Sequence, residues 1–197
     1  GDGMGSHRMV TKQVSFYEEM TNVPFIIAGP GIHPRQKPVE DLLTQPTIDL
    51  LPTLCELAGI PVPSSKPGIS LAPFLKGEKQ KRQHPYAASE WHSEYEVTVS
   101  PGRMIRSPRY KYTHYLEGNG EELYDMLKDK GERRNLAHDP KYSKILAEHR
   151  ALLDDYIRRT QDDYRSLKVE ADKRWRSHAP GYPNHEGPCA RDIINRK

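Results

Sequence analysis

Residues 86–125 constrain the fold of this chain more than any other stretch, because turn-forming residues divide them into short runs of strand-forming residues. The runs are residues 86–91, 103–106, 110–115 and 122–125, and the turns between the later runs are Pro101-Gly102, Ser107-Pro108 and Gly118-Asn119-Gly120. Short runs with such punctuation are typical of antiparallel strands. The sequence therefore predicts a small antiparallel sheet.

The residues that follow predict a long helix that covers this sheet. Asp139 and Pro140 suit the N-cap and the first turn of a helix. Beyond them, apolar residues recur at helical spacing and form one stripe: Ile145, Leu146, His149, Leu152, Leu153, Tyr156 and Ile157. An antiparallel sheet with one such helix makes a small α+β subdomain.

The first part of the chain predicts a buried strand and a helix. Residues 24–28 are a continuous apolar run that ends at Gly29, which is typical of a buried strand. After a loop at residues 29–41, helical spacing returns at Thr44 and stops at Gly59. We expect Pro52 to bend this helix or to divide it, because proline lacks a backbone donor.

A short helix and a linker complete the predicted organisation. Ser70 suits the cap of a helix over residues 71–76, and residues 77–83 are a charged linker. The predicted domains are therefore residues 1–80 and residues 84–164, followed by an irregular tail at residues 165–197.

The composition argues against several classes of protein. The chain mixes 30 basic with 27 acidic residues, and its net charge of +3 does not indicate a nucleic-acid partner. It has no run of about 18 apolar residues, so we expect no transmembrane helix and no membrane partner. Seventeen prolines and fourteen glycines indicate many loops, which fit a connected piece of a larger fold.

The cysteines and the histidines of the tail do not predict a metal site. Cys55 and Cys189 allow at most one disulfide, and Cys55 lies on the apolar helix pattern of a buried thiol. His178, His185 and Cys189 lack the spacing and the fourth ligand of a zinc site.

The glycine-rich start of the chain has the composition of a ligand-binding loop. Gly1, Gly3 and Gly5 allow tight turns and a close approach of the backbone to a ligand. His7 can donate a hydrogen bond or a proton, and Lys12 supplies a fixed positive charge. A flexible tail with a solvated lysine is the alternative interpretation, and the glycines do not form a phosphate-binding P-loop.

The segments around these residues resemble the type I sulfatases, which are formylglycine-dependent enzymes of the alkaline-phosphatase-like superfamily. The resemblance lies in Gly1 to His7 with Lys12, in the run from Phe16 to Gly31, in Asp-Leu-Leu-Pro-Thr-Leu at residues 49–54, and in residues 122–140. It implies an α/β fold, the C-terminal part of the alkaline-phosphatase-like core followed by the α+β subdomain. In residues 122–140, Lys130 stands where the family usually has proline.

The same resemblance implies the chemistry and the position of its parts. Sulfate-ester hydrolysis places negative charge on oxygens, so we expect His7 and Lys12 to be the catalytic residues of this chain. Neither Cys55 nor Cys189 has the sequence context of a formylglycine precursor. The formylglycine and the ligands of a calcium ion, Ca²⁺, are therefore expected on a preceding N-terminal part of the same enzyme, and the chain alone is expected to be inactive.

Four further residues are candidates for substrate binding: Trp91, His92, Arg103 and Arg106. An aromatic ring beside a histidine can stack on a sugar and bond its hydroxyls, although packing is the alternative for Trp91. The two arginines could bind an anion. The expected substrate is a sulfated carbohydrate, and the expected location, a family property, is periplasmic or secreted.

Two other functions stay open at this point. The same fold hosts phosphonate and phosphate ester hydrolases, and a noncatalytic binding module could also retain it.

Overall fold

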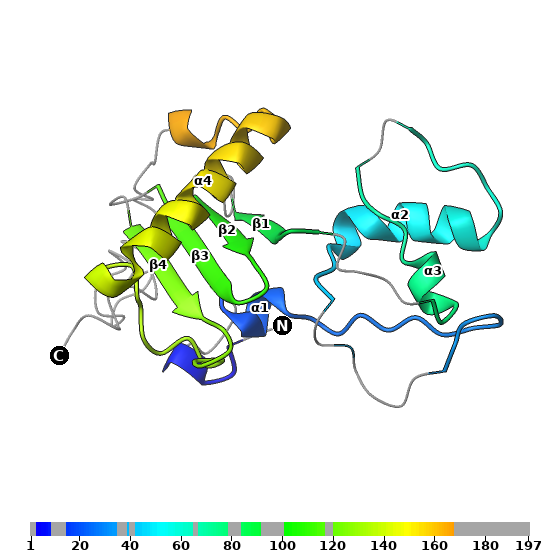
Figure 1. Cartoon of the computed structure of the whole chain (residues 1–197), viewed down its shortest axis with the longest axis horizontal. Coiled ribbons are helices and arrows are strands. Elements are labelled where there is room, and N and C mark those ends of the chain that lie inside the picture. Colours follow the sequence, from blue (N-terminus) through cyan, green and yellow to red (C-terminus); the bar gives the residue numbers. More distant parts are fainter. Residues whose placement is uncertain are drawn as a thin grey trace, which may run out of the picture. The chain divides into compact units, whose positions relative to one another are not determined.

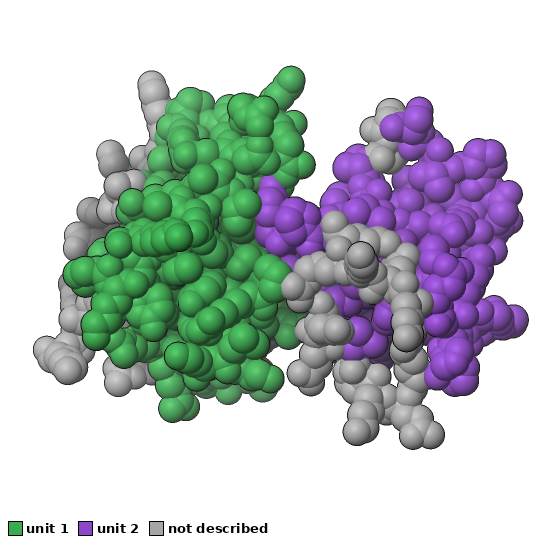
Figure 2. Space-filling view, in the orientation of Figure 1, with its two compact units in different colours: residues 1–23, 88–197 green, residues 24–87 purple. Residues whose placement is uncertain are grey.

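A computed structural model describes residues 3–8, 15–34, 39, 42–64, 67–78, 84–91, 101–116 and 120–167. Lys12, His92 and the predicted tail beyond residue 167 therefore lie outside the described residues. The chain divides into two compact units (Figure 2): a sheet unit, residues 1–23 and 88–197, and a helical unit, residues 24–87. The glycine-rich start thus belongs with the sheet, whereas the predicted ranges group it with residues 24–80. The predicted domains, residues 1–80 and 84–164, were defined for a whole enzyme, and they stay a prediction.

The sheet unit contains the predicted antiparallel sheet. Its strands are arranged in sequence order (Figure 1): β1 (Ala87–Trp91), β2 (Gly102–Arg106), β3 (Tyr110–Tyr115) and β4 (Gly120–Asp125). β2 and β3 are antiparallel, as are β3 and β4. The register places Arg103 opposite His114, and Lys111 opposite Tyr124.

The long helix α4 (Ser143–Thr160) lies across one face of this sheet, as Figure 1 shows. It follows a 3-10 turn, Pro140–Tyr142, at whose start the Asp139 carboxylate accepts a hydrogen bond from the Lys141 amide. Leu146, His149 and Leu153 of the predicted stripe are buried. The prediction of a helix that covers the sheet is confirmed.

The opposite face of the sheet is covered by residues 15–17 and the short helix α1 (Glu18–Thr21). Phe16 packs with Met104 and Tyr115, while Tyr17 packs with Tyr124 and Met126. A Cβ on Gly102 would lie 2.6 Å from the Phe16 ring, so a side chain there would displace it. Since both faces are covered, successive strand residues are buried instead of alternating with exposed ones.

The helical unit contains α2 (Pro46–Leu57) and α3 (Ala72–Leu75). Ser70 accepts a hydrogen bond from the Ala72 amide, but the N-cap position of α3 is Leu71, one residue later than predicted. Pro52 does not divide α2, which is continuous, and it leaves the Ile48 carbonyl without its helical donor. Gly68 approaches that carbonyl so closely that a Cβ would lie 2.0 Å from the oxygen.

A buried carboxylate joins the parts of the helical unit. Asp49 is fully buried and accepts hydrogen bonds from the amides of Gln45 and Ile69, at 2.8 and 2.9 Å. The His84 Nε2 atom lies 2.9 Å from the same carboxylate. The polar side of α2 therefore faces inward.

The predicted strand at residues 24–28 is wrong for the described structure, in which these residues have no regular secondary structure. Ile26 is 86% exposed. A strand needs a neighbouring strand for its hydrogen bonds, and none of the described strands pairs with this run. Cys55, predicted to be buried, is half-buried. None of the helices in the described ranges is long and apolar enough to cross a membrane.

Candidate functional site

His7 lies in a 3-10 turn (Ser6–Arg8) and is held against the sheet unit by an aromatic ring. Its backbone has a positive φ of 50°, a conformation that non-glycine residues seldom adopt. Its imidazole stacks on the Tyr17 ring, with centroids 3.7 Å apart and planes 2° from parallel. The side chain is only 10% exposed. Among residues 3–8, the turn at Ser6–Arg8 therefore places the His7 ring against Tyr17.

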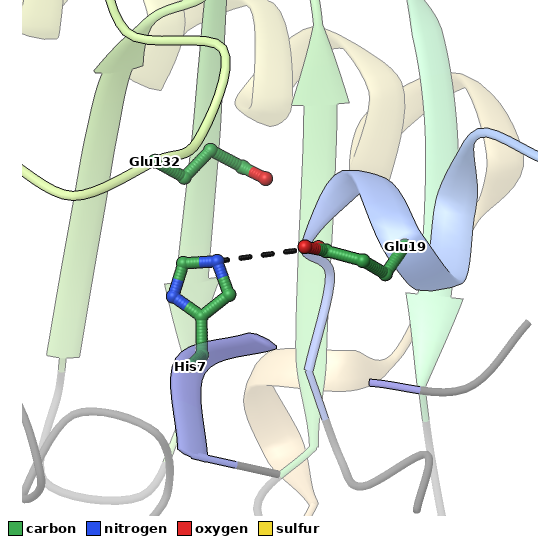
Figure 3. Close-up of side chains that lie close together, drawn as sticks. All are labelled: His7, Glu19 and Glu132. Carbon is green, nitrogen blue, oxygen red and sulfur yellow. Dashed lines mark ion pairs between the residues drawn. The ribbon is translucent and has the colours of Figure 1, made fainter. Parts of the chain in front are cut away.

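Two carboxylates face the His7 ring, as Figure 3 shows. Nε2 of His7 lies 4.0 Å from an oxygen of Glu19, in α1. The buried carboxylate of Glu132 belongs to the loop between β4 and α4, and one ligand atom from each of the three residues lies within 4.8 Å of the others. We call His7, Glu19 and Glu132 the acidic–histidine cluster.

A buried lysine of the central strand β3 lies beside this cluster. The Lys111 Nζ atom is 2.9 Å from Oε1 of Glu132 and 2.6 Å from Oε1 of Glu18. It also donates a hydrogen bond of 2.9 Å to the Phe16 carbonyl. The second oxygen of Glu132 accepts a 2.7 Å hydrogen bond from the Glu18 amide. Two residues of the sheet unit thus bind the backbone on both sides of Tyr17.

Burial and the neighbouring charges shift the pKa values of this site in different directions. Burial lowers the pKa of His7, and the Glu19 carboxylate opposes that shift. Burial also raises the pKa of Glu132, even though Lys111 acts in the opposite direction. Burial alone would raise the pKa of Glu18, but the charge and hydrogen bond of Lys111 lower it. Lys111 therefore favours the charged form of both glutamates that contact it.

The cluster does not fit the calcium ion implied by the family resemblance. Calcium takes six to eight oxygen ligands, whereas the cluster offers two carboxylates and an imidazole. The Lys111 ammonium already lies against Glu132 and would repel a cation. In the described part of the chain, this cluster can hold and orient an imidazole, and the Glu19 carboxylate within it partly offsets the effect of burial on the protonated form.

The other predicted site residues that the structure describes are Trp91, Arg103 and Arg106, and none of them belongs to the acidic–histidine cluster. Arg103 is buried on the face covered by α4, where it donates to the Asp162 carboxylate and to the Trp91 and Gly102 carbonyls. Arg106 faces the N-terminal segment, with its Nε 3.8 Å from Glu18. The Trp91 side chain packs against the cluster of Phe16, Met104 and Tyr115. In the described structure, Arg103 and Trp91 thus stabilise the unit, and the substrate-binding roles stay predictions, as do those of Lys12 and His92.

Sequence reasoning missed Lys111 and Glu132 as residues of the site. Lys111 lies in a predicted strand and Glu132 lies before the predicted long helix, so neither stood out as a site residue. Glu132 accepts a hydrogen bond from the first amide of α1, which begins 114 positions away, at Glu18. No local signal could reveal this contact. The side-chain oxygen of Asn135 accepts hydrogen bonds from the amides of Leu123 and Ala137.

Comparisons with known proteins give consistent results. The family model for the C-terminal region of N-sulphoglucosamine sulphohydrolase matches residues 5–159. Delta 4,5-hexuronate-2-O-sulfatase of Bacteroides thetaiotaomicron is 77% identical over 197 residues, which are 100% of this chain and 41% of the relative. A solved structure of a 2-O GAG sulfatase has a TM-score of 0.85 and 78% sequence identity, and the match covers 98% of this chain and 42% of that one. Another solved structure, of a protein in complex with its substrate D-glucosamine-2-N,6-O-disulfate, has a TM-score of 0.53 and 27% identity over 59% of this chain and 25% of that one.

The family match includes His7, the acidic–histidine cluster, the sheet and nearly all of α4. The chain spans about two fifths of the length of the 2-O-sulfatase and of the 2-O GAG sulfatase. The resemblance to type I sulfatases is confirmed, and the chain belongs to the sulfatase family defined by the C-terminal region of N-sulphoglucosamine sulphohydrolase.

Proposed function

We propose that this chain is part of a sulfatase that removes a sulfate ester from a sulfated carbohydrate, and that the substrate carries a 2-O-sulfate on an unsaturated hexuronate. The observation that carries the proposal is the 77% identity with Delta 4,5-hexuronate-2-O-sulfatase along all 197 residues. The match to the 2-O GAG sulfatase structure supports it at the level of the backbone.

The proposed role of His7 follows from its surroundings. In sulfate-ester hydrolysis the bridging oxygen gains negative charge as the bond to sulfur breaks, and an imidazolium can bind or protonate that oxygen. The Glu19 carboxylate, 4.0 Å from Nε2, favours the imidazolium, while the stacked Tyr17 ring fixes its plane. Lys12 is proposed to bind a sulfate oxygen.

The remaining parts of the reaction are proposed to lie on polypeptide that precedes this sequence. Formylglycine would supply the nucleophile and calcium would bind the sulfate oxygens. Neither Cys55 nor Cys189 has the sequence context of a formylglycine precursor. We also propose a periplasmic or secreted location, which fractionation of the producing cell would test.

The helical unit supports the proposal that further polypeptide packs against it. Its α2 helix turns Asp49 and Thr53 inward while Leu51 and Leu54 are exposed. Other exposed apolar side chains of this unit are Ile26, Val39, Leu50, Ile60 and Val62. An apolar surface of this kind is typical of a face that another part of the protein covers.

The test uses the complete enzyme, which contains this chain together with the preceding polypeptide. It should release sulfate from a Δ4,5-hexuronate-2-O-sulfate disaccharide faster than from a 6-O-sulfated glucosamine or a phosphonate monoester. His7→Ala and Lys12→Ala should each lower kcat by roughly 10² or more, because each removes a group that stabilises developing charge.

Three results would contradict the proposal in different ways. Faster turnover of the phosphonate monoester would favour the related ester hydrolase. Carbohydrate binding without sulfate release would favour a noncatalytic module. Near-normal turnover by both variants would reject the roles of His7 and Lys12.

A further inference from the structure

Two backbone conformations of low intrinsic stability meet at the acidic–histidine cluster. In the described part of the chain, the non-glycine residues with positive φ are Met4, His7, Glu132 and Gln161. His7 and Glu132, with φ of 50° and 48°, both contribute side chains to this cluster (Figure 3). Such conformations persist only where the surrounding structure imposes them, and they concentrate at functional sites.

The buried ion pair of Lys111 with Glu132 is also difficult to explain by stability alone. Each of these two side chains is 1% exposed. Removing two charges from water costs free energy that their mutual attraction repays only in part, so a buried ion pair is weak evidence for stabilisation. An apolar pair of similar size could fill the same space.

The atoms that this pair contacts identify its role. Lys111 binds the Phe16 carbonyl and the Glu18 carboxylate, while Glu132 binds the Glu18 amide. The residue between these anchored positions is Tyr17, which stacks on the His7 ring. The residue directly after them is Glu19, whose carboxylate faces His7 Nε2. Tyr17 and Glu19, which orient the imidazole, are therefore held in place because Lys111 and Glu132 bind the adjacent residues Phe16 and Glu18.

We propose that Lys111 and Glu132 are positioning residues of the proposed sulfatase site: they fix residues 16–19 so that Tyr17 and Glu19 hold the His7 imidazole in its reactive orientation. The inference rests on the proposed function, because it gives His7 a reaction to perform. It assigns part of the active-site geometry to the central strand β3 and to the loop that follows β4, neither of which needs to touch the substrate.

The experiment replaces the pair in the complete enzyme by Lys111→Met with Glu132→Gln, which approximately keeps the size of both side chains and leaves no charge at either position, while Glu18 keeps Arg106 as a charged neighbour. Glutamine can still accept a hydrogen bond from the Glu18 amide, but the ammonium bonds to Phe16 and Glu18 are lost. We expect kcat for the sulfated disaccharide to fall about tenfold, with KM changed by less than about twofold, because misplacing a catalytic group slows the reaction more than it weakens binding.

The matched control is Arg150→Met with Glu121→Gln, which removes an ion pair between α4 and β4 on the opposite face of the same sheet. This control should leave kcat unchanged. Thermal unfolding of each variant is measured alongside, so that a loss of folded enzyme is not mistaken for a loss of positioning. A neutral Lys111 and Glu132 variant that folds with the parent's kcat would overturn the inference.

Two further measurements keep the outcome decisive. If the neutral pair does not fold, Glu18→Gln is used, because Glu18 is partly exposed and its replacement leaves the buried pair intact. This variant should lower kcat about threefold at an unchanged unfolding temperature, and an unchanged kcat would overturn the inference. A parent enzyme without sulfatase activity would instead reject the proposed function.

Discussion

The two units differ in how much of their apolar surface they bury. The sheet unit covers both faces of its sheet with its own residues, so that Ile105, Tyr112 and Leu123 are almost completely buried. The helical unit turns Asp49 and Thr53 of α2 inward and exposes several of its large apolar side chains, among them Ile26 and Leu54. A segment that folds by itself normally does the reverse, because burial of apolar surface provides the main favourable free energy of folding.

This difference indicates that different interactions stabilise the two units. We infer that the sheet unit is stabilised mainly by apolar packing, which needs no other polypeptide. In the helical unit, hydrogen bonds to one carboxylate join α2 to the residues before and after it. Changes to single residues of each unit can test this contrast.

The largest effect is expected for Asp49→Ala in the helical unit. It removes the acceptor of the Gln45 and Ile69 amides and the partner of His84. Leaving several buried donors without an acceptor should cost about 4 kcal/mol of unfolding free energy. Hydrogen–deuterium exchange of peptides from residues 46–75, measured by mass spectrometry, should show the loss of protection.

The control for this change is Asp49→Asn, which keeps one acceptor oxygen and the size of the side chain. It should cost less than the alanine variant. Equal protection in the alanine variant and the parent chain would show that apolar packing, and not the carboxylate, holds this unit.

The second largest effect compares the same substitution in the two units. Leu123 is fully buried in β4, so Leu123→Ala should cost about 3 kcal/mol. Leu54 is 51% exposed in α2, so Leu54→Ala should cost roughly 0.5 kcal/mol or less in this chain. Chemical denaturation followed by hydrogen–deuterium exchange of peptides from each unit measures the two unfolding free energies separately.

Repeating the pair in the complete enzyme sharpens the comparison. If further polypeptide covers α2, Leu54→Ala should become clearly more costly there than in this chain. An equally small cost in both would argue against a covering partner on this side of the helical unit.

The fold of the sheet unit could be predicted from the sequence because its signals are local. Turn residues separate the strands, and a stripe at helical spacing marks α4. The strand at residues 24–28 could not be assessed in this way. An apolar run favours a buried segment but does not identify the strands that would pair with it, and in the described structure Ile26 of this run is exposed.

The site could be predicted only in part, for a related reason. His7 was proposed because residues 1–7 resemble the active-site loop of sulfatases, and the structure places it beside two carboxylates. Glu132 reaches the amide of Glu18 from 114 positions away, and Lys111 reaches the Phe16 carbonyl from 95 positions away. Contacts of this kind follow from how the N-terminal segment packs on the sheet, which short-range spacing does not encode.

A smaller effect is expected for Gly68→Ala, which tests the close packing beside Pro52. Gly68 has a φ of +108°, and a Cβ there would lie 2.0 Å from the Ile48 carbonyl oxygen. The backbone must shift to avoid this contact, which should cost about 2 kcal/mol. Gly59→Ala is the control, because Gly59 also has a positive φ but has no atom within 4 Å of the added Cβ. Equal costs for the two variants would mean that strain in φ, and not the contact with Ile48, explains the glycine.

The smallest effect concerns the response of the sheet unit to pH. His149 is buried in α4, its Nδ1 lies 2.8 Å from the Ile145 carbonyl, and its Nε2 lies 2.8 Å from the Ser107 hydroxyl. Nδ1–H therefore donates to the carbonyl, and the neutral ring can accept from the hydroxyl. Burial lowers the pKa of His149 below its usual value of 6.5, against the opposing effects of the Ile145 carbonyl and Glu148.

The sign of the pH effect follows from this shift. Between the two pKa values, the unfolded chain binds a proton at residue 149 that the folded chain does not, so stability rises with pH. The contribution of His149 is present above pH 6.5 and is lost as the pH falls from there toward the folded-state pKa. Denaturation curves at about pH 7.5 and about pH 5.5 should differ less for His149→Gln than for the parent chain, by on the order of 1 kcal/mol or below. His7, whose pKa is also lowered by burial, acts in the same direction and remains in both proteins, so the difference between them isolates His149. An equal pH dependence in the two proteins would show that the imidazole beneath α4 is not what makes the sheet unit sensitive to acid.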